Sequence, residues 1–356
     1  MTNPYRSFDA KAFWKTGVAQ GNIYEITDLW TPKFPIKREG GVVTAGSCFA
    51  QHISRAMIQN GFTWIDSEPA PDYIPEDQRR RFGYGVFSFR TGNIYTARLL
   101  RQWVEAAFGE ITLDDEVWET NERFYDPLRP AIEPDGFASR EECLELRAHS
   151  LNAIRKSLEK AQLFVFTLGL TESWRNRSTG LTYAACPGTL GGEFDAAAHE
   201  FHNLTYPEIV EDMTAVLDLV RKHNPDIRFL LTVSPVPLTA TASGNHVLPA
   251  TIYSKSVLRA VAGDLASARE DTDYFPSFEI ISSFPYRGAF YMPNQREVAS
   301  AGVAHVMTHF FAGLAKIGIE MSPTEPTAAP SPNAPPEEAV ETDIQCEEAL
   351  LEAFAK

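Results

Sequence analysis

The sequence predicts an α/β fold in which helices cover both faces of a parallel sheet. Two observations support this prediction. Apolar runs such as Leu163–Leu168 and Phe229–Val233 lack alternating polar residues, which is typical of strands buried on both faces. Between such runs lie segments with apolar residues at a period of about 3.6, of which Arg140–Ala161 and Pro207–His223 are the longest. Strands that alternate with helices favour a three-layer arrangement around a parallel sheet.

The remaining elements follow from the same patterns, taken in chain order. The first strand is predicted at Val42–Ala45, and the first helix at Gln51–Asn60. After them we expect a strand at Val86–Phe89, helices at Leu99–Ala107 and Ser254–Leu265, a strand at Phe278–Ile281 and a last helix at Val298–Ile317.

Two stretches fit this alternation poorly. Pro69–Thr91 and Asn121–Ser139 are rich in proline, aromatic residues and charge. We interpret them as insertions at the edge of the sheet that build pocket walls. Long surface loops without any role in a pocket are the alternative.

Composition narrows the class of protein. The chain has 356 residues, of which 44% are hydrophobic, and this suits either two average domains or one large α/β domain with insertions. The formal net charge of −15 argues against non-specific binding to nucleic acid or to an anionic membrane. The N-terminus lacks the apolar core of a signal peptide, and no apolar run is long enough to span a bilayer. We therefore expect a soluble, cytoplasmic protein without a membrane span.

The sequence changes character near its end. We expect an α/β domain over residues 1–320, a disordered linker rich in proline and acidic residues over 321–343, and a short amphipathic helix over 344–356. That helix either frays, folds back on the chain, or serves as a peptide for a protein partner.

The sequence Gly46-Ser47-Cys48-Phe49-Ala50 joins the first strand to the first helix. A turn at this place lifts the Ser47 hydroxyl out of the carboxyl end of the strand, where open α/β folds place their sites. The start of the helix favours developing negative charge, so Ser47 suits a nucleophile. A plain helix cap is the alternative role for this serine.

The string Thr44–Ala50 resembles the signature of the GSCFA family, a branch of the SGNH (GDSL-like) hydrolases. The resemblance extends from about Phe13 to about Phe311. It implies a flavodoxin-like, SGNH-type fold in which Ser47 is the nucleophile. It also implies acyl transfer, by an esterase or O-acyltransferase, on an acylated carbohydrate or a similar hydroxyl compound.

Oxyanion donors are expected at the ends of neighbouring strands. The resemblance places a backbone donor at Gly92 and a side-chain donor at Asn93, where a plain turn is the alternative. After Leu163–Leu168, Thr171 stands where SGNH enzymes have an asparagine. Glu172 follows it and could orient a histidine, bind substrate or cap the next segment.

The general base departs from the SGNH pattern. The usual Asp-x-x-His is replaced so that Asn294 stands for the aspartate and Glu297 for the histidine. Asn294 remains a candidate for substrate binding. We rank His246, in the loop after the Ser-Pro-Val-Pro segment, as the first candidate base. His305 ranks second, and it lies one helical turn from His309.

Further residue patterns bear on cofactors and on the choice of function. Neither a phosphate-binding Gly-Lys-Ser/Thr loop nor a dinucleotide-binding glycine pattern is present, and the four cysteines lack metal-type spacing. We therefore expect no cofactor and no metal. Lys255 could bind an anionic group or activate a hydroxyl, but a solvated lysine is the commoner case. The alternative to an enzyme is a degenerate SGNH-type fold that acts as a binding or scaffold protein through its tail.

Overall fold

The computed structural model describes residues 3–318 and 346–355. The chain forms two compact units. Unit 1 comprises Met1–Pro35 and Phe275–Thr342, and unit 2 comprises Ile36–Tyr274 and Asp343–Lys356. The predicted linker 321–343 and the boundaries at 320 and 343 lie outside the described residues, so the predicted domain limits stay a prediction.

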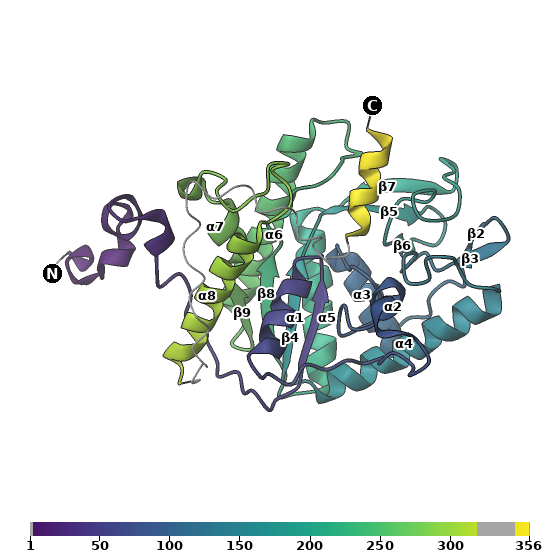
Figure 1. Ribbon diagram of the computed structural model, residues 1–356, viewed down its shortest axis with the longest axis horizontal. Helices are drawn as coiled ribbons and strands as arrows, with labels where there is room; N and C mark the ends of the chain where they lie inside the picture. The colour runs from purple at the N-terminus through teal and green to yellow at the C-terminus, as the bar shows by residue number, and fades with distance from the viewer. Residues whose placement is uncertain (1–2, 319–345, 356) are drawn as a thin grey trace. The chain divides into compact units, whose positions relative to one another are not determined.

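A parallel sheet forms the centre of unit 2. Its strand order is β1-β4-β8-β9, with β1 at Val42–Gly46, β4 at Leu163–Leu168, β8 at Arg228–Val233 and β9 at Thr272–Phe275 (Figure 1). The strands β1, β4 and β8 pair in parallel. All residues of β1 and β4 are buried, which explains their unbroken apolar runs. The predicted α/β class with a central parallel sheet is confirmed.

Helices flank this sheet. They are α1 (Ala50–Gln59), α3 (Ala97–Ala107), α4 (Arg140–Lys160), α5 (Tyr206–His223) and α6 (Val247–Ala268). Their starts follow from local chemistry. The Thr96 and Ser139 hydroxyls accept backbone hydrogen bonds at the N-termini of α3 and α4, and Thr205 forms a capping box with Glu208 in α5.

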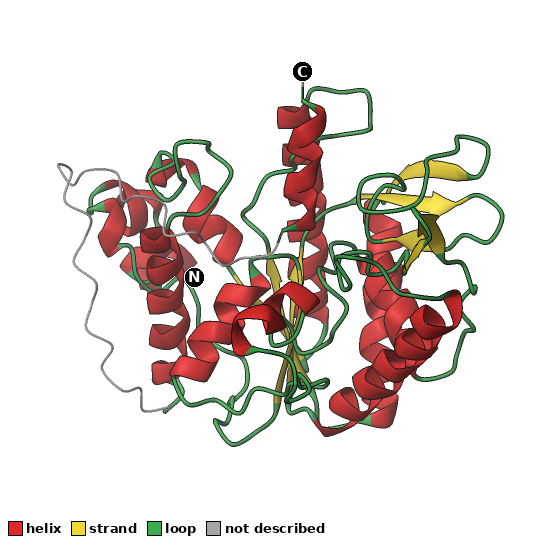
Figure 2. Cartoon of the chain, turned by 45° about the vertical axis from the view of Figure 1, so that its right-hand side comes forward, coloured by secondary structure: helices red, strands yellow, loops and turns green. Residues whose placement is uncertain are grey.

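Two small antiparallel sheets were not predicted from the sequence. One has the order β6-β5-β7, at Thr182–Tyr183, Glu172–Asn176 and His199–Asn203; the other pairs β2 (Trp118–Thr120) with β3 (Arg123–Tyr125). Figure 2 shows the small sheets apart from the central strands. The cross-strand pair of Trp174 and Phe201, with ring centroids 5.6 Å apart, helps to hold the first of them. Such short polar strands have too little hydrophobic alternation to be recognised.

Two predicted strands are wrong. Val86–Phe89 is buried but irregular. Ser88 donates a backbone hydrogen bond to Thr44 of β1, and Trp64 forms an isolated bridge with Val42 of the same strand. Each segment pairs its backbone with β1 at one position only, so neither forms a strand. Phe278–Ile281 lies within a helix, α7 (Ser277–Ser282), and the true strand β9 ends just before Pro276. Proline cannot continue a central strand, so the chain changes conformation there.

Unit 1 contains α7 and α8 (Ser300–Lys316) together with short 3-10 and π turns at Pro4–Ser7, Ala10–Ala12, Lys15–Ala19, Ile23–Glu25 and Phe284–Tyr286. Its core is aromatic. The Trp30 ring lies 5.1 Å from the ring of Phe275 and 5.4 Å from that of Phe310. This close approach of Trp30 to α8 requires Gly313, where a Cβ would meet the indole at 2.4 Å.

The insertions and the chain end complete the described structure. Pro69–Thr91 contains the short helix α2 (Glu76–Arg79) and a 3-10 turn at Arg80–Phe82. The predicted terminal helix is a 3-10 helix over Glu347–Phe354, and it belongs to unit 2. Among the described residues, no helix combines the length and the apolarity that crossing a membrane requires.

Candidate active site

The turn between β1 and α1 places Ser47 at the carboxyl end of the sheet, as expected. Gly46 has a φ of +130°, and a Cβ on it would lie 2.4 Å from the Thr167 carbonyl oxygen. The Ser47 amide donates to that same oxygen at 3.0 Å. Only glycine suits this conformation and this close approach, so the position of Ser47 depends on Gly46.

The Ser47 hydroxyl is buried. The residue is 2% exposed, and its Oγ has no hydrogen-bond partner among the described residues. The same holds for the hydroxyls of Thr167 in β4 and Thr171 just after β4. Most buried polar atoms in proteins are hydrogen-bonded, so these three hydroxyls near the ends of β1 and β4 are candidates for contact with a ligand.

The segment after Gly92 runs beside the Ser47 turn. The Ile94 amide donates to the Gly46 carbonyl at 2.9 Å. A Cβ placed on Gly169 would lie 3.0 Å from both the Ser47 Cβ and the Tyr95 carbonyl oxygen. The residues predicted as nucleophile and oxyanion donor are therefore close neighbours, although about 45 positions separate them.

Asn93 binds a carboxylate of the chain itself. Its side-chain Nδ2 donates to Glu347 Oε2, and its backbone amide lies 3.4 Å from Glu347 Oε1. The Tyr95 hydroxyl donates to Glu347 Oε2 at 3.2 Å. Gly92 contributes through its left-handed conformation, with a φ of +68°, and a Cβ there would meet Glu347 Oε1 at 2.9 Å. This part of the site therefore binds the oxygens of a carboxyl group.

Burial affects both partners of this contact. It raises the pKa of the Glu347 carboxyl, although the hydrogen bonds from Asn93 act in the opposite direction. Burial and the nearby acidic groups raise the pKa of Tyr95 well above its ordinary value, so its hydroxyl stays protonated as a donor.

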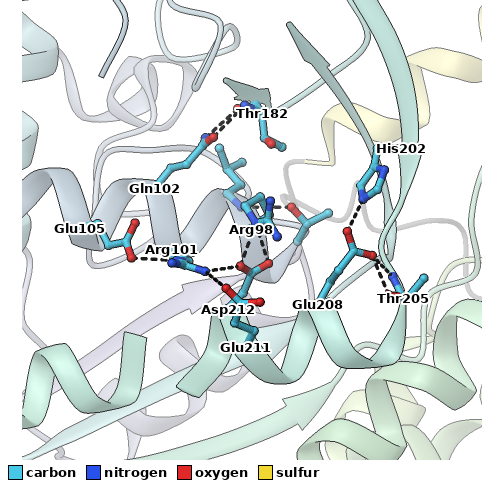
Figure 3. A network of polar contacts seen from close by, with 12 residues as sticks. Arg98, Arg101, Gln102, Glu105, Thr182, His202, Thr205, Glu208, Glu211 and Asp212 are labelled. Atoms are coloured by element: carbon cyan, nitrogen blue, oxygen red, sulfur yellow. Dashed lines mark hydrogen bonds and ion pairs between the residues drawn. The ribbon is translucent and has the colours of Figure 1, made fainter. Parts of the chain in front are cut away.

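Polar contacts fix the helix that follows these donors (Figure 3). Arg98 Nε donates to both carboxylate oxygens of Asp212 in α5 at 2.8 Å, and Arg101 Nη1 reaches Asp212 at 3.1 Å. Gln102 exchanges two hydrogen bonds with the backbone of Thr182 in β6. Since Thr96 caps the same helix, these contacts hold the Asn93–Tyr95 segment in place.

The turn after β4 carries the candidate residues Thr171 and Glu172. The Thr171 amide donates to Ser254 Oγ at 3.0 Å, so only the Thr171 hydroxyl remains as a candidate donor. Glu172 accepts from the Thr241 hydroxyl at 2.5 Å and from the Ala242 amide at 3.2 Å. Burial raises the pKa of the Glu172 carboxyl. Glu172 therefore orders the loop before α6, and contacts no histidine in the described structure.

The expected contact between His246 and Ser47 is not formed. His246 is exposed, and its Nδ1 accepts a hydrogen bond from the Leu248 amide at 3.1 Å. It is thus the N-cap of α6. The sequence prediction missed this capping role because it placed the start of the helix at Ser254, whereas α6 begins at Val247.

Lys255 is buried, whereas a solvated side chain was the commoner expectation. It is 2% exposed, and its Nζ donates to the Gly169 carbonyl oxygen at 2.6 Å. This contact brings the Lys255 amine from α6 to Gly169 in the turn after β4, and Gly169 lies against Ser47. The sequence signal was available, since Lys255 lies on the face of α6 that carries Thr251 and Leu258, both buried.

The remaining candidates belong to unit 1. Asn294 is exposed, and its Oδ1 accepts from the Arg296 and Glu297 amides within a turn. His305 stacks on Phe290 with ring centroids 4.7 Å apart, and His305 Nε2 lies 3.2 Å from His309 Nε2. Burial lowers the pKa of His309 to about 4. Within unit 1 the two histidine rings pack against each other, with centroids 4.6 Å apart.

A cavity of 480 Å³ opens beside Tyr95. Residues from β5, from the loop 183–189 and from the loop 238–242 line it, together with Glu347, Glu348, Leu351 and Phe354. Ser47 is not among the residues that line this cavity. Nor are any residues of the described insertions Pro69–Thr91 and Asn121–Ser139, so they are not walls of this cavity.

Comparisons with known proteins place the chain in a family. The model of the GSCFA family matches residues 41–310. A search of curated proteins found no match.

Among solved structures, the chain is similar to a carbohydrate esterase of family 3 from Talaromyces cellulolyticus, at 10% identity over 78% of this chain and 97% of that one, with a TM-score of 0.35. It is also similar to a family 2 carbohydrate esterase with a carbohydrate-binding domain from Corynascus thermopiles (Myceliophthora fergusii), at 12% identity over 81% and 69% of the two chains, with a TM-score of 0.33. An acetyl xylan esterase from Butyrivibrio proteoclasticus matches at 13% identity over 68% and 56%, with a TM-score of 0.24.

Proposed function

The chain belongs to the GSCFA family, and we propose that it catalyses acyl transfer through Ser47, as an esterase or an O-acyltransferase. The observation that supports this proposal best is the Glu347 carboxylate bound by Asn93 beside the Gly46–Ser47 turn. Donors that hold a carboxylate oxygen are suited to the oxyanion that develops when an ester carbonyl is attacked. The proposal includes a flavodoxin-like, SGNH-type architecture for the central sheet.

The proposed reaction has two steps. Ser47 Oγ attacks the ester carbonyl carbon and loses its proton to a base, and the tetrahedral oxyanion receives hydrogen bonds from Asn93 and Thr171. The bond to the alcohol oxygen breaks, and the alcohol leaves with the proton. Water or an acceptor hydroxyl then attacks acyl-Ser47, which releases a carboxylic acid or a new ester and restores the serine.

The substrate in this proposal is an acylated carbohydrate or a similar hydroxyl compound. The carbohydrate part rests on the resemblance to SGNH hydrolases alone, because the fold by itself does not determine a substrate. The ester part rests on the site, where a hydroxyl and oxyanion donors lie together.

His246 is the proposed general base, and Glu172 holds the loop that leads to it. For this role His246 must leave its capping position, so its two functions need to be separated. His246→Asn keeps a good N-cap but removes the imidazole. We expect this variant to melt like the wild type and to lose acyl-transfer activity by about 10²–10⁴-fold. Full activity in His246→Asn would remove His246 from the mechanism.

Labelling by a fluorophosphonate tests the nucleophile directly. The full chain should be labelled, Ser47→Ala should not, and the exposed Ser178→Ala should be labelled like the wild type. Because Glu347 occupies Asn93, Glu347→Ala is labelled in parallel as a more accessible form. If neither the wild type nor Glu347→Ala reacts while both are folded, the binding or scaffold function replaces the enzymatic one.

A further inference from the structure

The C-terminal segment, Cys346–Ala355, binds in the candidate site through polar contacts at its start. Glu347 receives the hydrogen bonds of Asn93 and Tyr95 described above. The next residue is held as well, because the Thr239 amide donates to Glu348 Oε1 at 2.9 Å and the Glu348 amide lies 3.4 Å from the Tyr95 hydroxyl. Two successive acidic residues are thus recognised by separate donors.

The rest of the segment borders the cavity with apolar side chains. Leu351 lines the cavity and is partly buried, while Phe354 contributes to its lining but is 66% exposed. In Figure 1 the yellow helix of the segment lies beside β5, the strand that carries Trp174. The segment therefore presents a carboxylate at Asn93 and apolar groups along the cavity.

The walls of the cavity are mostly apolar. Leu99, Leu170, Trp174, Tyr183, Phe194 and Leu238 line it. The other two carboxylates in its lining are already engaged, Glu172 by Thr241 and Ala242, and Glu348 by Thr239. With the C-terminal segment in place as part of its wall, the cavity has a volume of 480 Å³, within the range of about 300–1,000 Å³ that is typical of small-molecule sites.

We propose that this cavity binds a carboxylate or ester whose acyl chain is apolar, with its oxygens at Asn93 and Tyr95, and that the C-terminal segment is its intramolecular competitor. The proposal identifies the acyl group of the proposed substrate, and to that extent it rests on the proposed function. The binding part does not, because binding requires no catalysis. Only one carboxylate can use the Asn93 donors at a time, so the segment must leave before a ligand enters.

Calorimetric titration of the full chain with sodium octanoate measures this competition. For a ligand that binds only the open form, the apparent dissociation constant is the intrinsic constant divided by the fraction of open protein. Removing the competing carboxylate in Glu347→Ala should therefore tighten octanoate binding at least tenfold. Glu352→Ala, an exposed acid of the same helix, is the matched control and should bind octanoate like the wild type.

Two further titrations locate the ligand. Asn93→Asp, placed in the Glu347→Ala background, should weaken octanoate binding at least tenfold, because a second carboxylate repels the ligand. Sodium acetate should bind at least tenfold more weakly than octanoate, because it lacks the chain that contacts Leu170 and Trp174. Saturating octanoate should also speed amide hydrogen exchange in Glu347–Phe354 of the wild type.

The outcomes separate this inference from the catalytic proposal. Equal octanoate affinity in the wild type and Glu347→Ala, or no faster exchange in Glu347–Phe354, overturns the competition. Equal binding of acetate and octanoate, or no binding of octanoate to Glu347→Ala at millimolar concentration, overturns the apolar acyl class. Ser47→Ala should retain octanoate binding, so failure of fluorophosphonate labelling would leave the inferred binding site intact.

Discussion

Asp126 is predicted to be a main determinant of the stability of unit 2. It is 0% exposed and accepts hydrogen bonds from Arg129 Nε at 2.9 Å, from Arg147 Nη2 at 2.8 Å and from the Leu128 amide at 3.1 Å. Asp126→Asn preserves the shape but leaves two buried guanidinium groups without their counter-charge. Breaking a buried ion pair in this way costs about 3–5 kcal/mol.

This cost can be measured as a shift in thermal unfolding. About 1 kcal/mol lowers the melting temperature of a domain of about 150–250 residues by about 2–4 °C, so we expect a drop of roughly 6–20 °C. Asp135→Asn is the matched control, because its ion pair with Arg81 at 2.9 Å is exposed and should contribute less than about 1 kcal/mol. Similar melting temperatures for the two variants would refute the reasoning.

The stability difference between the wild type and Asp126→Asn should depend on pH. Burial opposes ionisation of Asp126, but the charges of Arg147 and Arg129 outweigh it and lower the pKa of its carboxyl below the ordinary 3.8. A lowered pKa in the folded state stabilises the fold above pH 3.8, and this stabilisation is lost as the pH falls through the folded-state value. The difference in unfolding free energy between wild type and Asp126→Asn should therefore be constant near neutral pH and shrink in acid. A difference that grows in acid would contradict this.

Three further predictions use other parts of the chain. Gly46→Ala should destabilise the fold more than Gly61→Ala. Both glycines have a positive φ, but only at Gly46 would the added Cβ meet a carbonyl oxygen, that of Thr167 at 2.4 Å. Urea unfolding of the two variants measures the difference. Burial lowers the pKa of His309 from 6.5 to about 4, so below pH 6.5 the unfolded state binds a proton that the folded state does not. The free energy of unfolding should therefore fall by up to about 3 kcal/mol as the pH drops from 6.5 to 4. His309→Gln should remove this contribution. Glu172→Gln should speed amide exchange in the loop 239–246, and unchanged exchange would show that Glu172 does not order it.

Local patterns in the sequence determined the central fold. The strands β1, β4 and β8 and the helices α4 and α5 lie within a few residues of their predicted bounds, because burial on both faces and a helical period leave a clear trace in neighbouring residues. The position of Ser47 followed for the same reason, since the Gly-Ser turn is itself a local feature. The polar strands of the small sheets and the helix α7 left no such trace.

Only the tertiary structure decided what surrounds Ser47. Glu347 reaches Asn93 across 254 positions of sequence, and Lys255 reaches Gly169 across 86. Side-chain contacts of this kind depend on how distant segments pack, and a single sequence carries no periodic signal for them. His246 illustrates the limit, because its loop was correctly placed after β8 while the cap that it forms on α6 depends on the conformation of that loop. The sequence thus determined where Ser47 stands, and the packing of remote segments determined which groups surround it.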